Sequence, residues 1–307
     1  MFTKINSYLR RLKILVIVVK NWPLALLIKV GMKSEASLKL RNDQIFSLRK
    51  SNWNDFLELI FFLYYFPDGS IKNNIATFNY RGRTVNFCVG DGVGMRTMVE
   101  IFGGDIYRTF YKMASVKGCT VLDIGSAFGD TALSFLFEGA SFVYGVEANP
   151  GWVDLARKNL MLNGLSGQAV FVNAIVNAEN GENFVSYSIS NMFNLSKKNT
   201  IKNQDAILVP KVTISSLVNQ FKLNDAILKM DIEGYEYQII LNSDLSTLRK
   251  FKYMVIEYHY GFEKLKSHLE EAGFKVAYTL PHESYMPDIE EEHLRMFQVG
   301  DIYAVRI

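Results

Sequence analysis

From residue 118 onward, short apolar segments alternate with segments of helical periodicity, and this alternation constrains the fold more than any other feature of the chain. Neighbouring parallel strands must be joined by crossover connections, which are usually helices. The pattern therefore predicts an α/β fold, a doubly wound and mostly parallel sheet of Rossmann-like type. The five segments predicted as its first strands are Thr120–Ile124, Ser141–Glu147, Ala169–Val172, Ala226–Asp231 and Tyr253–Glu257.

The two ends of the chain differ from this pattern. At the C-terminus, Phe274–Leu280 and Asp301–Ile307 are strand-like with no helical pattern between them, which predicts an antiparallel edge to the sheet. At the N-terminus, residues 1–70 have a mainly helical pattern, and Ala76–Val89 alternates about a turn, as in a hairpin. A length of 307 residues exceeds one average domain. We therefore predict an accessory region over residues 1–114 and a catalytic domain over residues 115–307.

The strongest functional signal is the loop that follows the first predicted strand. Gly125 and Gly129 stand four residues apart in this loop, and a helix follows at once. Glycine lets the backbone turn tightly and approach a ligand, and ligands of open α/β sheets bind beyond the carboxyl ends of the strands. Glu147 ends the next strand, 22 residues after Gly125, near the ~20-residue offset at which an acid reaches a ribose. These features predict a cofactor that contains adenosine.

The composition of the loop favours S-adenosylmethionine over a dinucleotide. Dinucleotide loops use small residues so that a pyrophosphate can rest on the helix N-terminus. Here Phe128 fills that region, and Asp130 would repel a pyrophosphate. Asp123 adds a negative charge that suits the ammonium and sulfonium groups of S-adenosylmethionine. The predicted cofactor-binding residues are Asp123, Gly125, Ser126, Phe128, Gly129, Asp130, Thr131, Glu147, Ala148, Asn173 and Asp231.

Four segments of the chain, in this order and spacing, resemble the FkbM-type methyltransferases. They are Asp123–Thr131, Val146–Pro150, Leu228–Glu236 and Ile256–His259, of which Lys-Met-Asp-Ile-Glu-Gly-Tyr-Glu is the most distinctive. The resemblance covers residues 115–260. It implies a Rossmann-like methyltransferase fold, S-adenosylmethionine as donor, and O-methylation, often of sugars or natural products. The chain departs from the family at Ser126–Phe128, where Ala-Asn-Ile or a similar sequence is more common, so one hydrogen bond near the cofactor is lost.

Methyl transfer to a hydroxyl group needs a place for the hydroxyl proton, and a general base contributes ~10²–10⁴-fold to the rate. Four candidates, Asp231, Glu233, Glu257 and His259, lie at or just past the ends of the fourth and fifth predicted strands. We expect His259 to be the base, because the ordinary pKa of histidine lies near neutral pH. Glu257, two residues away, would orient it. The same four groups suit Mg or Mn, but nothing in their spacing requires a metal ion, so we predict none.

The acceptor is expected to be a small molecule or a glycan. The stretches Asn191–Asp205 and Pro281–Gly300 are candidate lids over it, or else ordinary solvated loops. A net charge of +3 gives no reason to expect nucleic acid. Cys88 and Cys119 are far apart and form no CxxC pair, so a reducing cytosol is the default location.

Positive charge is concentrated at the front of the chain. Residues 1–42 contain nine lysines and arginines but only one acid, Glu35. The apolar runs Ile14–Val19 and Leu24–Ile28 are shorter than the ~20 residues of a membrane span. Such a segment could lie on an anionic membrane surface, giving a peripheral location. We favour the alternative that it packs on the protein's own core.

Two other functions compete with O-methylation. A nucleic-acid methyltransferase is disfavoured, because the fourth strand ends in Asp231-Ile232-Glu233-Gly234 instead of an Asp/Asn-Pro-Pro-aromatic sequence, and its acidic rim would repel phosphates. A non-catalytic protein that kept the fold is the second alternative, since a fold alone does not prove activity.

Overall fold

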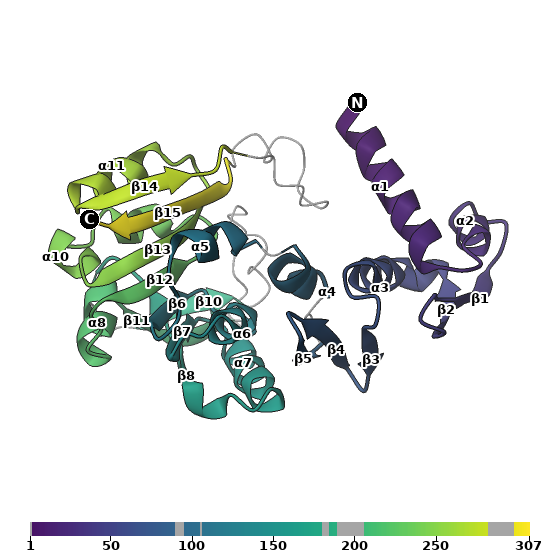
Figure 1. Cartoon of the computed structure of the whole chain (residues 1–307), viewed down its shortest axis with the longest axis horizontal. Coiled ribbons are helices and arrows are strands. Elements are labelled where there is room, and N and C mark those ends of the chain that lie inside the picture. The colour runs from purple at the N-terminus through teal and green to yellow at the C-terminus, as the bar shows by residue number, and fades with distance from the viewer. Residues whose placement is uncertain (1, 90–94, 105, 180–183, 189–205, 282–297) are drawn as a thin grey trace. The chain divides into compact units, whose positions relative to one another are not determined.

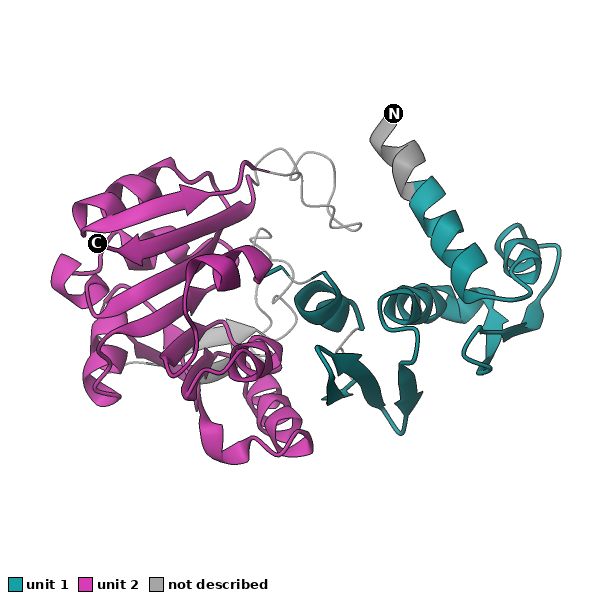
Figure 2. Cartoon of the chain, viewed as in Figure 1, with its two compact units in different colours: residues 1–106 teal, residues 107–307 magenta. Residues whose placement is uncertain are grey.

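The computed structural model describes residues 2–89, 95–104, 106–179, 184–188, 206–281 and 298–307. The chain forms two compact units, residues 1–106 and residues 107–307 (Figure 2). The division falls before the predicted boundary at residue 114, so the helix α5 (Arg108–Met113) belongs to the second unit. Within the described residues, no helix is long and apolar enough to cross a membrane.

Unit 1 consists of helices and two small antiparallel sheets. Its helices and strands are α1 (Phe2–Val18), α2 (Pro23–Lys29), β1 (Glu35–Lys39), β2 (Ile45–Arg49), α3 (Trp53–Tyr65), β3 (Ser70–Lys72), β4 (Ile75–Tyr80), β5 (Arg83–Cys88) and α4 (Met95–Met98), followed by a π-helical turn (Val99–Gly103). The predicted hairpin is confirmed: β4 pairs with β5 about Arg81 and Gly82, both of which have positive φ.

The mainly helical prediction for residues 1–70 is wrong for residues 35–49, where β1 and β2 form a hairpin. Each of these strands buries one side chain, Leu38 or Leu48, and neither shows an apolar alternation that would identify a strand.

The core of unit 1 is aromatic. Phe78 is buried, with its ring centroid 4.3 Å from that of Phe66 and 5.4 Å from that of Phe102.

Unit 2 contains the alternating strands and helices that the sequence predicts (Figure 1). After α5, its elements are β6 (Thr120–Ile124), α6 (Asp130–Phe137), β7 (Phe142–Glu147), α7 (Pro150–Leu162), β8 (Ala169–Asn173), β9 (Ile175–Val176), β10 (Phe184–Ser188), β11 (Ala206–Val212), α8 (Ile214–Gln220), β12 (Ala226–Met230), α9 (Glu236–Ile240), α10 (Leu245–Leu248), β13 (Phe251–Tyr258), α11 (Glu263–Glu271), β14 (Phe274–Tyr278) and β15 (Gly300–Arg306).

The main sheet has seven strands in the order β14-β15-β13-β12-β6-β7-β8. The five strands from β13 to β8 are mutually parallel, whereas β15 runs antiparallel to both β13 and β14. The predicted doubly wound sheet with an antiparallel end is therefore confirmed, and β15 is the strand that reverses direction. The chain order reverses between β6 and β12, which is the switch point where open α/β sheets bind ligands. A smaller sheet, β10-β11-β9, was not predicted.

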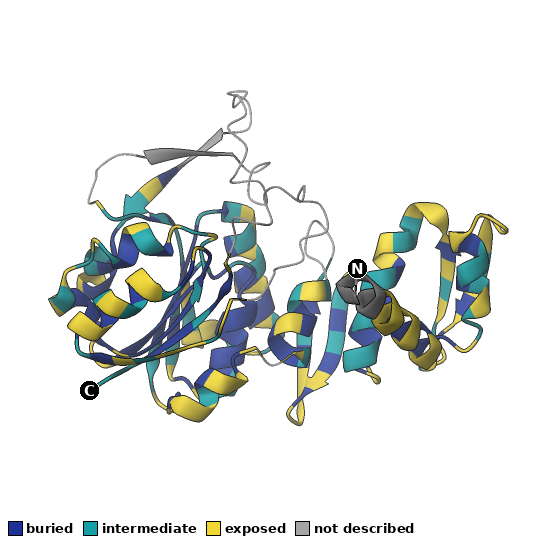
Figure 3. Cartoon of the chain, turned by 90° about the horizontal axis from the view of Figure 1, so that it is seen from above, coloured by how far each residue is buried: buried dark blue, intermediate teal, exposed yellow. Residues whose placement is uncertain are grey.

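Side chains alternate across the main sheet and so give its two faces different characters. Leu122, Leu228 and Ile256 belong to one apolar core with residues of the helices α8 to α11. Paired positions on the opposite face carry Asp123 and Lys229. The strands of this sheet are largely buried (Figure 3). The buried ion pair of Asp123 and Lys229 therefore lies on the face opposite this apolar core, close to the switch point.

Candidate functional site

The loop between β6 and α6 is shaped by the glycines that the sequence singles out. Gly125 has a φ of 76°, and a Cβ at this position would overlap the backbone oxygen of Asp231. Gly129 has a φ of 75°, and a Cβ there would lie 3.0 Å from the Cβ of Ala156. Both glycines thus permit close contact of the loop with the protein itself. This contact places the loop directly against the end of β12.

Asp123 is fully buried beneath this loop and is held by the protein. Its Oδ1 lies 3.1 Å from the Nζ of Lys229, and the hydroxyl of Thr131 donates a hydrogen bond to its Oδ2. The Lys229 ammonium also donates to the backbone oxygen of Gly125 at 2.7 Å. The charge expected to face the cofactor is therefore neutralised within the fold, and Asp123 and Thr131 fix the start of the loop.

Glu147 lies at the end of β7, where the sequence predicts the ribose-binding acid. Its Oε2 accepts a hydrogen bond from the backbone N–H of Ala127 at 3.1 Å, and its Oε1 accepts one from Asn149 at 2.8 Å. Burial raises the pKa of Glu147, and these two backbone hydrogen bonds oppose that rise. Each carboxylate oxygen has a second lone pair with which to accept a hydroxyl hydrogen bond.

The remaining predicted cofactor residues surround Glu147 and the loop. The Asn173 amide donates to the backbone oxygens of Glu147 and Ala148, at 3.0 and 2.8 Å, and so fixes the turn after β7. Phe128 is buried with its ring centroid 4.6 Å from that of Trp152. Ser126 is completely buried, and among the described residues its hydroxyl has no hydrogen-bond partner.

Asp130 begins α6 and is buried. Burial raises its pKa to about 7, although the ammonium of Lys229 opposes the rise. At neutral pH, the carboxyl group of Asp130 is therefore partly protonated.

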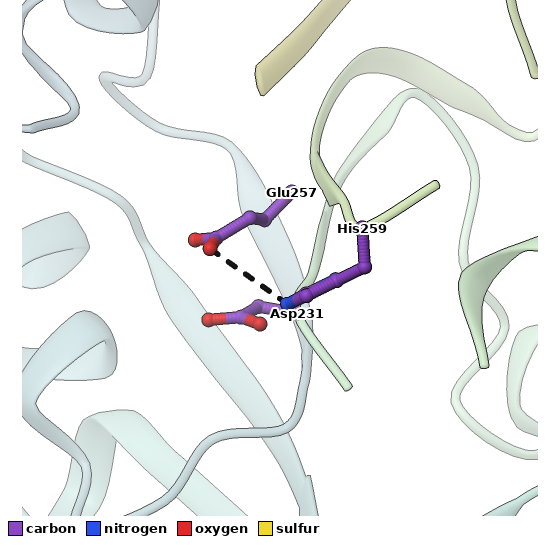
Figure 4. A group of neighbouring side chains, drawn as sticks. All are labelled: Asp231, Glu257 and His259. Carbon is purple, nitrogen blue, oxygen red and sulfur yellow. Dashed lines mark ion pairs between the residues drawn. The ribbon is translucent and has the colours of Figure 1, made fainter. Parts of the chain in front are cut away.

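The predicted catalytic residues Asp231, Glu257 and His259 converge beyond the ends of β12 and β13 (Figure 4). The closest donor atoms of the three side chains all lie within 4.8 Å of one another. The His259 Nε2 is 3.9 Å from the Glu257 Oε1, and His259 is only 4% exposed. Two carboxyl groups and one imidazole are thus held together against the cofactor loop.

Two further acids face His259 from the segment that leads into α9. Glu233 Oε2 lies 3.4 Å from its Nε2, and Glu236 Oε1 lies 3.4 Å from its Nδ1. Glu236 begins α9, as predicted, but it is fully buried and also accepts a hydrogen bond from the backbone N–H of Ile232. The backbone of Glu233 is left-handed, with a φ of 56°. This turn directs its carboxylate toward the imidazole.

The charges of this cluster follow from its crowding. Burial lowers the pKa of His259, but the nearby carboxylates of Glu233, Glu236 and Asp231 outweigh this and raise it to about 11. The charge of Asp231 and burial raise the pKa of Glu257 to about 9. Burial raises the pKa of Asp231 to about 6, against the attraction of Lys229. At neutral pH, His259 is therefore an imidazolium, and the closely spaced carboxyl groups of Asp231 and Glu257 share one proton.

Oxygen and imidazole donors are also ligands for Mg²⁺ or Mn²⁺. Within the part of the chain that the structure describes, Asp231, Glu257 and His259 are the group whose donor atoms converge closely enough to hold such an ion. Their carboxylates also make the site suited to accepting a proton.

Sequence reasoning missed two residues of the site. Lys229 belongs to the Lys-Met-Asp-Ile-Glu-Gly-Tyr-Glu motif, but the sequence assigned it no role. The register of β12 and β6 places it beside Asp123. Tyr107 is buried at the start of unit 2, and its pKa is raised by burial and by the charges of Asp231, Asp123, Glu257 and Asp130. It precedes the first predicted strand and carries no motif, so no sequence signal identified it. The predicted lids fall at residues 191–205, outside the described residues, and at 281–300, of which 282–297 lie outside them.

The sheet order, the glycine loop at its switch point and the carboxylate at the end of β7 define a class: an open α/β protein with a candidate ligand site beyond the carboxyl ends of its central strands. The methyltransferase FkbM domain matches residues 123–276, half of the chain. The protein belongs to this family and is an S-adenosylmethionine-dependent methyltransferase. No curated protein sequence matches the chain well enough to be called a relative.

Several solved structures are similar to the chain at low sequence identity. TYW2 of M. jannaschii, solved with AdoMet, is 16% identical, with a TM-score of 0.39 over 78% of this chain and 89% of that one. The ribosomal protein L11 methylase of Lactobacillus delbrueckii is 13% identical, with a TM-score of 0.39 over 66% and 77%. Precorrin-6y C5,15-methyltransferase of Geobacter metallireducens is 14% identical, with a TM-score of 0.36 over 66% and 89%. At these identities the likeness concerns the fold alone.

Proposed function

We propose that the protein is an O-methyltransferase that binds S-adenosylmethionine at the β6–α6 loop and uses the adjoining acid–imidazole cluster to take the proton of an acceptor hydroxyl. One observation carries the proposal. Gly125 of the cofactor loop packs against the backbone of Asp231, whose side chain belongs to the cluster with Glu257 and His259. The proposed cofactor loop and the proposed proton acceptor are therefore direct neighbours in the fold.

The residues of the loop suit this cofactor. Glu147 would accept hydrogen bonds from the ribose hydroxyls, and the buried hydroxyl of Ser126 is a polar group for a ligand to satisfy. When bound, S-adenosylmethionine supplies an electrophilic methyl group. Asp123 and Lys229 would act as positioning residues, because their ion pair fixes the loop from below.

Within the cluster, we assign proton acceptance to Asp231 in place of His259. An imidazolium has no free lone pair with which to accept a proton, whereas Asp231, whose pKa is raised by burial, shares one proton with Glu257 and can accept another. A base with a pKa near the working pH is effective. His259, held between Glu233 and Glu236, would stabilise the negative charge of the Asp231–Glu257 pair.

The acceptor class that we favour is a sugar hydroxyl of a glycan or natural product. This part rests on the family, whose members often methylate such acceptors. The first experiment is a calorimetric titration with S-adenosylhomocysteine of the wild type, of Glu147→Gln and of the exposed control Glu271→Gln. We expect tight binding by the wild type and the control, and an affinity at least about tenfold lower in Glu147→Gln. Unchanged affinity in Glu147→Gln would refute the assigned cofactor site.

A transfer assay then tests the chemistry. Methyl glycosides of common hexoses and deoxyhexoses would be incubated with methyl-labelled S-adenosylmethionine, and base-stable label would be counted, since an ether survives alkali and a methyl ester does not. We expect Asp231→Asn to lose at least about 10²-fold in turnover while still binding S-adenosylhomocysteine. Cofactor binding without any base-stable product would favour the non-catalytic alternative.

A further inference from the structure

The helix α1 has two apolar sides, and only one of them is buried. Ile14, Leu15, Val18 and Val19 lie inside unit 1. Four other apolar residues form what we call the outer stripe, and their exposures are Tyr8 63%, Leu9 58%, Leu12 41% and Val16 36%. At about 100° per residue, these four positions fall within one arc of about 100° on the helix surface. The predicted packing on the protein's own core therefore accounts for only part of the apolar sequence.

Two more apolar residues are exposed after α2. The Lys29 ammonium at the end of α2 lies 5.7 Å from the centre of the Tyr8 ring, so the end of α2 lies beside the outer stripe. Val30 and Met32 follow directly and are 67% and 74% exposed. Exposed apolar residues are ordinary when scattered, but a contiguous group indicates an interaction surface.

The segment that carries this surface is strongly basic. Residues 1–42 carry nine basic side chains and the single acid Glu35, whose carboxylate pairs with Arg49 at 2.9 Å. The whole chain has 34 basic and 31 acidic residues, so residues 43–307 have 25 and 30. Arg11 and Lys13 on α1 are exposed, whereas Lys20, next to α1, pairs with Asp43. The positive charge of the protein is therefore concentrated in the segment that carries the outer stripe.

We propose that the outer stripe and its basic flanks dock unit 1 on an anionic lipid bilayer. The apolar side chains would enter the boundary between headgroups and acyl chains, and the lysines and arginines would contact the headgroups. An apolar face and a basic cluster are the two signals that stable peripheral binding requires. A partner that buried the stripe alone would leave this positive charge without a counterpart. The inference does not depend on the proposed acceptor or on the catalytic residues.

Flotation with vesicles tests the proposal with the full-length protein. Neutral phosphatidylcholine vesicles would be compared with vesicles that contain a quarter phosphatidylglycerol. The stripe variant is Leu9→Ser/Leu12→Ser/Val16→Ser, and the charge variant is Arg11→Glu/Lys13→Glu. The matched control is Met161→Ser/Val170→Ser, which alters two exposed apolar residues of unit 2. Circular dichroism and S-adenosylhomocysteine binding would show that every variant is folded.

We expect the wild type and the control to float with anionic vesicles at least about tenfold more than with neutral ones. Both α1 variants should lose this binding, and added salt should weaken it. An environment-sensitive dye on Leu12→Cys should shift to the blue when anionic vesicles are added. Equal flotation of the stripe variant and the wild type would overturn the proposal, as would a complete lack of binding. Concentration-dependent dimerisation that the stripe variant abolishes would assign the surface to a second copy of the chain instead.

Discussion

The Nζ of Lys229 lies 3.1 Å from the Oδ1 of Asp123, and the two side chains are 3% and 0% exposed. The pair joins two adjacent parallel strands, β12 and β6, directly below the cofactor loop. Because the ammonium also donates to the Gly125 backbone oxygen, the pair links the interior of the sheet to the conformation of the loop.

We expect Lys229→Met to lower the free energy of unfolding by about 3–5 kcal/mol, because it leaves the Asp123 carboxylate buried without its partner. The double variant Asp123→Asn/Lys229→Met should recover part of this loss. Denaturation by urea of the wild type, both single variants and the double variant gives the coupling energy. Additive effects of the two substitutions would show that the pair contributes nothing as a pair.

Gly125→Ala should destabilise the protein by more than about 3 kcal/mol, because the new Cβ overlaps the Asp231 backbone oxygen and the backbone is left-handed. Gly118→Ala is the matched control. Its φ is 79°, but a Cβ there meets no atom within 4 Å. This variant should therefore lose only the about 1–2 kcal/mol of stability that a left-handed backbone costs alanine. Thermal and urea unfolding of the two variants separate overlap from strain. Similar losses in both would contradict the assigned contact.

Asp130→Asn should stabilise the protein, and more so at higher pH. The folded-state pKa of Asp130 is raised to about 7, above the ordinary value, so the wild type loses stability as the pH rises through that interval. Asparagine cannot ionise and avoids this loss. The gain should be about 1–2 kcal/mol at pH 5 and up to about 4 kcal/mol at pH 8. Unfolding measured at both values, beside the exposed control Asp154→Asn, checks this; a gain independent of pH would refute it.

His259 should remain protonated well above neutral pH, because the close carboxylates of Glu233 and Glu236 raise its pKa to about 11. Its imidazole nitrogen shifts, measured by NMR with ¹⁵N-labelled histidine and assigned with His259→Asn, should not change between pH 6 and pH 9. Glu236→Gln should lower the pKa. A titration of wild-type His259 near its ordinary value of ~6.5 would instead favour it as the base.

The parts of the fold that could be predicted are those in which local pattern and tertiary role agree. The strands around the switch point are short apolar runs bounded by polar residues, and the helix at Pro150 begins with Asn149, whose side chain accepts the Gly151 N–H at 2.9 Å. The β1–β2 hairpin buries only Leu38 and Leu48, which is too weak a pattern to distinguish it from a helix.

The sequence predicted which residues lie near one another at the candidate site better than it predicted their protonation states. Strand ends identified Asp231, Glu257 and His259, because parallel strands bring their carboxyl ends to one edge. Their protonation states depend on neighbours that a linear pattern does not reveal, such as the buried Glu236 on one side of the imidazole. The charges of the same acids raise the pKa of Tyr107, which comes from a part of the sequence with no motif, so only the folded chain could relate it to the site.

The two hydrogen bonds that Glu147 accepts, one from Ala127 and one from Asn149, have a consequence for the kinetics of ligand capture. They fasten the glycine loop and the start of α7 to the same carboxylate before any ligand arrives. A binding surface assembled in advance has little conformational entropy left to lose. Encounter with the ligand should therefore proceed in a single kinetic phase whose observed rate rises linearly with ligand concentration, without a slow rearrangement that would make it level off.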